Sequence, residues 1–258
     1  MPKPPEPTAT REATAGAGPQ HGGWAVRRLS GTVGELHART PDPDAGREVW
    51  LMTPLDAAVV LGSTQPETVA AGPATGTTTE SASGGPADGD PADTSGISIV
   101  RRRSGGGAVL VTPGDCVWVD VIVGRGDPLW DDDVNRASWW LGRAWADALA
   151  SLGVGPAQVV QRFEPGPWGR LVCFAGRGPG EVTVGGAKVV GVTQRRTRTT
   201  ARFQTLLYRR WAPETLLKRL VVPSHRVEEL RGALARAARP VAARPEHLHA
   251  ALLAAMPQ

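Results

Sequence analysis

Hydrophobic and polar residues follow one another in short blocks along much of the chain, as in a strand-rich protein. Short apolar runs bounded by turn residues predict buried strands. Five such runs lie in the first half of the chain, at residues 48–52, 57–61, 97–100, 108–111 and 116–123. Further along, residues 181–184 and 187–192 predict a hairpin, because the Gly185-Gly186 pair between them suits a tight turn.

Helical periodicity is confined to one long segment and to the C-terminal part of the chain. Acidic residues 131–133 suit a helix N-terminus and Gly153 is a typical stop. Between them, apolar residues recur at helical spacing: Val134, Ala137, Leu141, Ala144, Trp145, Ala148, Leu149 and Leu152. From Pro213 onward the pattern predicts three helical pieces, separated by Pro223 and by residues 240–245. Because strands dominate and helices are few, the predicted class is α+β.

Two segments show no hydrophobic periodicity. Residues 1–22 are mostly Pro, Ala, Thr and Gly, which predicts a disordered tail. Residues 65–96 contain five acidic residues but no aromatic residue, Lys or Arg. A structureless loop of that length is unusual inside a domain, so it is predicted to be a mobile insertion. We therefore expect one folded domain over residues 23–222, interrupted by this insertion, and a helical segment over 223–258.

Composition excludes several classes of protein. The chain has 258 residues, of which 41% are hydrophobic, enough for a sizeable core. Two cysteines, Cys116 and Cys173, cannot form a disulfide framework, and neither has metal-ligand spacing, so no metal site is predicted. No apolar run could span a membrane, and the N-terminus lacks the apolar core of a secretory signal. We therefore expect a cytoplasmic protein with no membrane partner.

Charge adds one further feature, since the net charge is +4 and arginines are concentrated between residues 195 and 239. Such a cluster is most simply a solvated face. It also suits phosphate groups or an acidic protein. Nonspecific binding of nucleic acid would use the same charges, but nothing else in the sequence favours it.

The sequence RRRSGGGAVLVTPG, residues 101–114, contains the most informative motif. Three consecutive glycines after a strand let the backbone approach a ligand closely and direct N–H groups at it. Arg101 and Arg102 add positive charge for a phosphate or carboxylate. No Gly-Lys-Ser/Thr follows, so the motif is not a P-loop. A Gly-rich turn beside a surface basic cluster is the alternative interpretation.

Lys188 lies on an otherwise apolar strand, directly after the predicted hairpin turn. A lysine there either protects an edge strand from aggregation or serves as a functional ammonium in a pocket. Gly191 follows three residues later, and Gln194, Arg195 and Arg196 come next. That pattern favours a site that neutralises an anion. Asp120 is similarly unusual on an apolar strand, and would either hold Lys188 or an arginine, or face solvent.

These motifs resemble those of the lipoate–protein ligase A family. The residues RRRSGGGAV (101–109) are similar to that family's signature, and GGAKVVGVTQRR (185–196) to its second motif. A third stretch, VVLGSTQ (59–65), is similar to a strand that borders the acyl pocket in the family. The three occur in the family's order. Octanoyltransferases and, more distantly, biotin ligases are related to the same family.

The resemblance implies a mixed β-sheet flanked by helices, as in class II aminoacyl-tRNA synthetases and biotin ligases, with residues 23–222 as the catalytic domain. It also implies a reaction in two steps. Lipoate or octanoate attacks the α-phosphate of ATP, with Mg²⁺, to form an acyl-adenylate. A lysine of a carrier domain then displaces AMP. The carriers would be lipoyl domains of 2-oxoacid dehydrogenases or the glycine-cleavage H protein.

The resemblance also assigns residues. Lys188 would bridge the acyl carbonyl and the phosphate, and Arg102, with Arg101, would neutralise phosphate. The apolar acyl chain would lie in a slot between strands, with Val60, Leu61, Val109 and Val119 as walls. The expected substrate-binding residues are Gly62, Gln65, Arg101, Arg102, Ser104, Gly105, Gly106, Gly107, Ala108, Gly191 and Arg195.

Two departures from the family pattern leave alternatives open. Val111 to Asp115 stands where many ligases have His-Asp-x-Gly-Asn, and the chain after Pro213 is too short for their C-terminal accessory domain. Some related octanoyltransferases carry an acyl-accepting cysteine near the position of Cys173, and they need no ATP. Cys173 is therefore either such a nucleophile or a small buried hydrophobe. A noncatalytic homologue that binds a ligand or a carrier is the third alternative.

Overall fold

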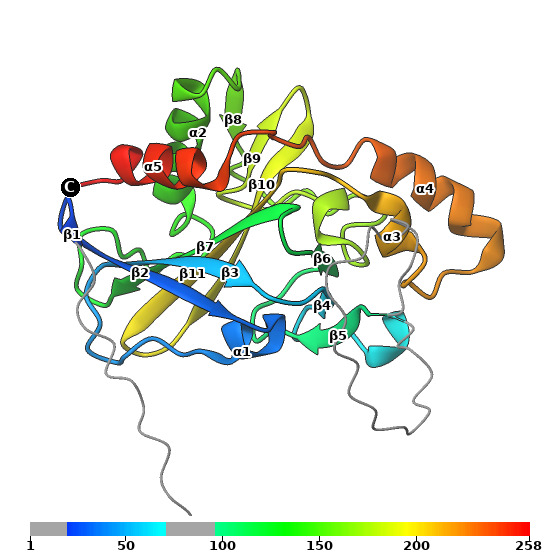
Figure 1. Ribbon diagram of the computed structural model, residues 1–258, viewed down its shortest axis with the longest axis horizontal. Helices are drawn as coiled ribbons and strands as arrows, with labels where there is room; N and C mark the ends of the chain where they lie inside the picture. The colour runs from blue at the N-terminus through cyan, green and yellow to red at the C-terminus, as the bar shows by residue number, and fades with distance from the viewer. Residues whose placement is uncertain (1–19, 71–95) are drawn as a thin grey trace, which may run out of the picture.

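The computed structural model describes residues 20–70 and 96–258, so residues 1–19 of the predicted tail and most of the predicted insertion lie outside them. Gln20–His21, which the sequence assigned to the disordered tail, form a short strand instead. An eight-stranded mixed sheet forms the centre of the fold (Figure 1). Strands β2 and β3 are parallel and the other neighbours are antiparallel. In spatial order the strands are β1 (Gln20–His21), β2 (Trp24–Gly31), β3 (Glu48–Pro54), β7 (Cys116–Gly124), β11 (Thr200–Tyr208), β10 (Ala187–Arg196), β9 (Val182–Val184) and β8 (Ala157–Val159).

A second, three-stranded sheet lies beside the first. Its order is β5 (Ser98–Arg101), β4 (Ala58–Leu61) and β6 (Val109–Val111), and β4 is parallel to β5 and antiparallel to β6. The turn at residues 112–115 therefore connects two different sheets, with Gly114 at φ +77°. The mixed sheet with flanking helices confirms the predicted fold class.

Helices cover the sheets and account for the C-terminal part of the chain. The three predicted C-terminal pieces are confirmed. In the residues that the structure describes, no helix is long and apolar enough to cross a membrane. The helices are α1 (Val33–Ala38), α2 (Trp139–Ser151), α3 (Pro213–Leu217), α4 (Val227–Ala235) and α5 (Pro245–Ala255), with 3-10 turns η1 (Glu67–Val69), η2 (Cys173–Ala175) and η3 (Ser224–Arg226).

The long helix begins later than the sequence predicts, at Trp139 rather than near residues 131–133. The Asp131 carboxylate accepts a hydrogen bond from the backbone N–H of Asp133, whose own carboxylate accepts one from Asn135. Short acidic side chains that bind the backbone two residues on compete with the helix and form turns instead. The acidic cluster therefore precedes the helix rather than capping it.

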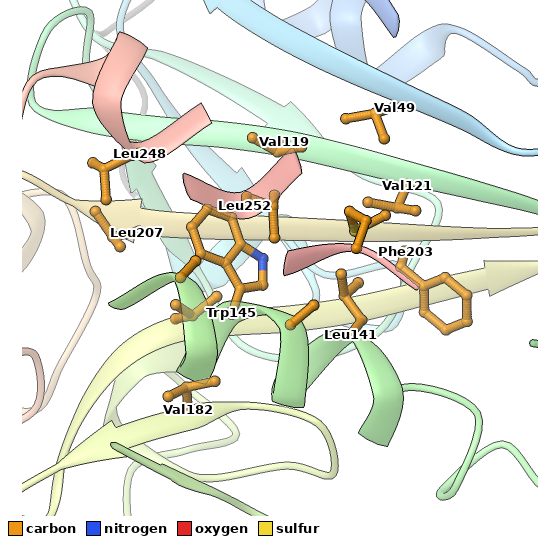
Figure 2. Close-up of a cluster of buried hydrophobic side chains, with 14 of the residues drawn as sticks. Val49, Val119, Val121, Leu141, Trp145, Val182, Phe203, Leu207, Leu248 and Leu252 are labelled. Carbon is orange, nitrogen blue, oxygen red and sulfur yellow. The ribbon is translucent and has the colours of Figure 1, made fainter. Parts of the chain in front are cut away.

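The main core lies between the eight-stranded sheet and the helices α2 and α5. Figure 2 shows Trp145 of α2 and Leu252 of α5 gathered with Val119 and Phe203 of the sheet. The predicted C-terminal segment thus contributes directly to this core. Burying such large apolar side chains stabilises the fold by about 1.5–3 kcal/mol each.

Asp120 holds an arginine, which decides between the alternatives that the sequence left open. Its carboxylate is fully buried and lies 2.5 Å from Nη2 of Arg202. Trp118 Nε1 also donates to it, at 2.7 Å. Burial raises the pKa of Asp120, and the charge and hydrogen bonds of Arg202 oppose that shift. The pair anchors α1, because Arg202 Nη2 also donates to the Leu36 carbonyl at 3.0 Å.

Candidate functional site

The glycine-rich motif forms a loop that folds over its own second arginine. Nη2 of Arg102 donates to the carbonyls of Gly105 at 2.7 Å and Gly107 at 2.9 Å, and Nη1 donates to Val60 at 3.2 Å. Gly106 has a φ of +98°, a conformation that favours glycine. The loop backbone is thus positioned by a guanidinium that lies beneath it.

The strand of the third motif packs directly against this loop. A Cβ atom at Gly62 would lie only 1.9 Å from the Gly106 carbonyl oxygen, so only glycine allows the approach. Gln65 accepts a hydrogen bond from the Gly62 N–H at 3.0 Å and donates to the carbonyls of Arg170 and Leu171. Arg101 adds hydrogen bonds to the carbonyls of Gly62 and Gln65.

Ser104 and Ala108, the remaining polar and small residues of the motif, join the loop to the rest of the site. The Ser104 hydroxyl donates to Gln204 of β11 at 3.0 Å. The Ala108 N–H donates to Leu171, and the Cys173 N–H donates to the Ala108 carbonyl at 3.0 Å. The loop, the β11 strand and η2 are therefore one connected unit.

Lys188 lies in the interior and not on an exposed strand edge, with 2% of its surface accessible. Its Nζ is 2.7 Å from Oε2 of Glu181 and donates to the Cys173 carbonyl at 2.6 Å. Burial raises the pKa of Glu181, and the charge of Lys188 opposes that shift. Of its three N–H donors, Lys188 has one left after these two partners.

Sequence reasoning missed Glu181 as a site residue, although the hairpin contains a signal for it. Lys188 is directly opposite Thr183 in the β9–β10 pairing. Side chains two residues apart along a strand share a face, so Glu181 falls on the side of Lys188. An acidic residue at that offset from a lysine in a predicted hairpin predicts an ion pair.

Two neighbouring cavities lie at this site. The larger, called the open cavity, has a volume of about 840 Å³, and its lining includes Gly105–Gly107, Lys188 and Glu181. The smaller, called the inner cavity, has a volume of about 40 Å³. Cys173, Val192 and Thr193 line both. The other residues that line the inner cavity are His37, Val60, Arg102, Val109, Val111, Trp118, Phe174, Gly191, Gln204, Thr205 and Leu206.

Two of the four residues expected to form the walls of an acyl slot line the inner cavity. Val60 and Val109 line the inner cavity, whereas Leu61 and Val119 do not. Leu61 packs in a separate cluster with Trp168, and Val119 packs in the main core. Alternate residues of a strand face opposite sides, so a strand neighbour of a wall residue points away from the cavity.

Most of the predicted site residues lie together around these two cavities. Gln65 and the three glycines line the open cavity, and Gly191 lines the inner one. Cys173 is a free, half-buried thiol on η2 rather than on a strand. Arg195 is exposed and lies outside the lining of both cavities. Cys116 is buried, which raises the pKa of its thiol to about 12, as expected of a structural residue.

His37 is a second residue that sequence reasoning missed. Its ring lies 4.4 Å from the Trp118 ring, and its Nδ1 is 3.2 Å from Nε2 of Gln204. Burial, reinforced by the charges of Arg102 and Arg202, lowers its pKa to about 3. The sequence signal that could have identified His37 is the capping box of Thr32 and Glu35. It fixes the start of the short helix α1 and so places His37 in its last turn.

The fold and the site together define a class of protein. The fold is a mixed sheet with flanking helices, and the site brings together a glycine loop, a buried lysine and an adjoining apolar cavity. The family model described as the lipoyl protein ligase A/B catalytic domain matches residues 36–220. The chain belongs to that family, which confirms the resemblance and indicates an enzyme of the ligase or transferase kind.

Solved structures agree with the assignment of the fold. A bi-partite lipoate protein ligase from Thermoplasma acidophilum, studied with its E2 lipoyl domain, is 15% identical, with a TM-score of 0.62, over 89% of this chain and 80% of that one. A lipoate-protein ligase A bound with ATP is 18% identical, with a TM-score of 0.53, over 89% and 91%. A putative lipoate protein ligase from T. acidophilum with lipoic acid bound is 16% identical, with a TM-score of 0.53, over 88% and 92%. No curated protein sequence matches the chain significantly.

The close approach of Gly62 to the loop generates a paired prediction. Gly62→Ala should lower the free energy of unfolding by about 1–3 kcal/mol, because the new methyl group collides with the Gly106 carbonyl. Gly105→Ala is the control, since a Cβ atom there meets nothing within 4 Å. Urea denaturation of both variants measures the difference. Equal stabilities would contradict the assigned packing.

The buried imidazole generates a pH prediction. The pKa of His37 is about 3 in the folded protein against an ordinary value of 6.5, so the unfolded chain takes up the proton first as pH falls. The contribution of His37 to the free energy of unfolding is therefore fully present above pH 6.5 and is lost as the pH falls toward 3. Between pH 7 and pH 5, the free energy of unfolding of the wild type should fall by about 2 kcal/mol more than that of His37→Gln. His21→Gln, at an exposed position, should follow wild type. Identical pH dependence in all three proteins would refute the assignment.

Proposed function

We propose that this protein is a lipoate–protein ligase, which activates lipoate or octanoate with ATP and transfers the acyl group to a lysine of a carrier domain. The observation that carries the proposal is the position of the Lys188 ammonium. It lines the open cavity together with the glycine loop, and it donates to the carbonyl of Cys173, a residue that lines both the open and the inner cavity. The inner cavity, at about 40 Å³, would have to widen to admit an acyl chain, whose carboxyl group could then lie near Lys188 in the open cavity.

The open cavity supports the adenylation step by its size and lining. Its volume of about 840 Å³ is in the range of cavities that hold whole cofactors. Loop N–H groups and the remaining Lys188 donor would bind oxygen atoms of the acyl phosphate, where negative charge develops. Arg170 also lines the cavity and would face the nucleotide, whereas Arg177, a second lining arginine, is paired with Glu164. The related structures with ATP and with lipoic acid support the same substrates.

The chain offers little to a protein-bound Mg²⁺ ion. Glu181 is the one carboxylate in the described lining of the open cavity, and Lys188 and the Gly178 N–H already occupy it. Magnesium would therefore arrive with the phosphates of ATP, as it commonly does. We assign no step to a metal held by this chain.

The second step needs an acceptor amine. A carrier-domain lysine would attack the acyl carbonyl, form the amide and release AMP, while Lys188 holds the carbonyl oxygen. The Thermoplasma ligase studied with an E2 lipoyl domain supports a lipoyl domain as the acceptor. Lipoyl domains of 2-oxoacid dehydrogenases and the glycine-cleavage H protein are the proposed carriers.

The ligase proposal is tested with full-length protein, ATP, Mg²⁺, lipoate or octanoate and a carrier domain. We expect an acyl-adenylate and a carrier whose mass increases by the acyl group. Lys188→Met should slow the reaction at least a hundredfold, because losing one preorganised donor costs about 2.7–4 kcal/mol. Arg198→Met, an exposed cation, is the matched control.

Because Lys188→Met leaves Glu181 buried without its counter-ion, thermal unfolding must be measured as well. The double variant Lys188→Met with Glu181→Gln removes both charges and separates folding from catalysis. Absence of both the adenylate and the modified carrier with either acid would contradict the ligase proposal.

Cys173 supports a second candidate, an ATP-independent acyl transferase. Its thiol lies at the junction of the two cavities, within reach of a chain in the inner one. Arg101 and Arg102, expected to bind phosphate, donate instead to backbone carbonyls. The thiolate would attack a donor thioester, form a new carbon–sulfur bond and release the donor thiolate. The carrier amine would then displace Cys173 as thiolate and lose a proton to solvent.

Trapping separates the two candidates. Incubation with an octanoyl thioester, without ATP, should add the octanoyl group to Cys173 and not to Cys173→Ser. Cys116→Ser should behave as wild type, because that thiol is buried. Absence of any acyl-enzyme would reject the transferase. If both assays fail while ligand binding persists, the protein is a noncatalytic homologue.

A further inference from the structure

A third cavity, called the side cavity, also reaches Lys188. It has a volume of about 290 Å³, and its lining includes Lys188, Gly176 and Arg177, which line the open cavity as well. Its other walls differ from those of the open cavity, since they include Ala233 and Arg236 at the end of α4. No residue of the glycine loop belongs to its described lining. The same lysine therefore borders two cavities with different walls.

The side cavity adjoins a shallow groove beside the β9–β10 hairpin. The groove has a volume of about 680 Å³ and shares Arg177, Gly186 and Arg236 with the side cavity. It is lined by the hairpin turn and by the connector between α4 and α5, which also contributes Arg239. Side cavity and groove, together called the docking surface, thus extend from the molecular surface to the site lysine.

The connector between α4 and α5 is held against β10 at Lys188 itself. The Lys188 N–H donates to the Ala237 carbonyl at 2.9 Å, and the Arg239 N–H donates to the Lys188 carbonyl at 2.8 Å. Figure 1 shows the connector passing beside the β9–β10 hairpin. The backbone of the connector therefore keeps a fixed position relative to the site.

Two arginines of the docking surface have no opposite charge. Arg236 and Arg239 are exposed, and in the part of the chain that the structure describes neither side chain forms an ion pair or a hydrogen bond. Glu164 is the one carboxylate in the described lining, and it lies 3.2 Å from Nη1 of Arg177. The site lysine is paired as well. The docking surface therefore presents two uncompensated positive charges beside the site.

We propose that the docking surface binds an acidic face of the carrier domain and directs its acceptor lysine through the side cavity. The proposal rests on the acyl-attaching function proposed above, in either of its two forms. The acyl group and any nucleotide would occupy the inner and open cavities, so the side cavity offers the acceptor amine a separate route to Lys188. Fixed charges that face a surface of opposite sign steer association and set the orientation of the partner.

The charge pattern favours an acidic protein over a nucleic acid. A nucleic acid carries a charge on every phosphate and binds through many cations. The docking surface offers two unpaired arginines, and each guanidinium can bind one carboxylate through two hydrogen bonds. A few well-placed carboxylates around an acceptor lysine would match this pattern.

The test uses the full-length protein, with an apo lipoyl domain and an apo H protein as probes. Arg236→Glu combined with Arg239→Glu should weaken carrier binding in a calorimetric titration, and raise the KM for the carrier, by about tenfold or more. The kcat should change little, because the substitutions remove docking and leave the reacting groups in place. The difference from wild type should shrink at high salt, since salt screens exposed charges.

Arg143→Glu combined with Arg198→Glu is the matched control, because both arginines are exposed and lie outside the described lining of every cavity above. Arg236→Gln combined with Arg239→Gln should give an intermediate loss, and it keeps the test valid if the double reversal fails to fold. Equal losses in the control and docking-surface variants would overturn the proposal. So would unchanged carrier binding in the docking-surface variants.

Formation of the adenylate, or of an acyl-enzyme from a small thioester, needs no carrier and reports on the proposed function separately. If wild type forms either species but binds neither carrier, the docking proposal is overturned and the chemistry stands. If neither species forms, the proposed function fails, and the titration still decides the docking surface. Tighter binding of duplex DNA than of either carrier, lost in the same variants, would assign the surface to nucleic acid and overturn the proposal.

Discussion

The site depends on the burial of one ammonium group. Lys188 can lie in the interior only because Glu181 compensates its charge at 2.7 Å and the Cys173 carbonyl accepts a second hydrogen bond. This one side chain therefore fixes β9, β10 and η2 relative to one another. A buried ion pair costs desolvation and needs well-placed partners to offset it. That requirement holds the ammonium at the lining of the open cavity, where the proposed reaction would need it.

Around that pair, the glycines matter mainly because they allow backbone segments to pack closely against one another, and less because they are flexible. Gly62 allows the β4 strand to touch the loop, and a Cβ atom at Gly107 would lie 2.7 Å from the Cys173 nitrogen. The loop is thus in backbone contact with both the strand before it and the η2 turn. Arg102 completes the arrangement by donating to two loop carbonyls. Under the proposed function, a loop held in this way would supply preorganised N–H donors to an anionic transition state.

The distribution of charge separates the two chemistries that the family could perform here. Adenylation would need cations that face the open cavity, and the lining supplies Arg170 and the Lys188 ammonium, while Arg177 is paired with Glu164. Thioester chemistry would need a nucleophilic thiol beside the acyl slot, and Cys173 lines both cavities. Both routes would share Lys188 and the acyl slot. They would differ in whether activation comes from the nucleotide or from the sulfur, which is a question of electrostatics rather than of fold.

The sequence by itself determined the fold class, the family and the two motifs, because strand periodicity and close-approach glycines are local signals. Most of the site residues could be predicted for the same reason. Tertiary structure alone decided that the pair of Lys188 and Glu181 is buried, that His37 lines the inner cavity and that Arg102 lies beneath its loop. It also showed that Leu61 and Val119 face elsewhere. These facts depend on which side chains meet across elements distant in sequence, and burial then selects their partners.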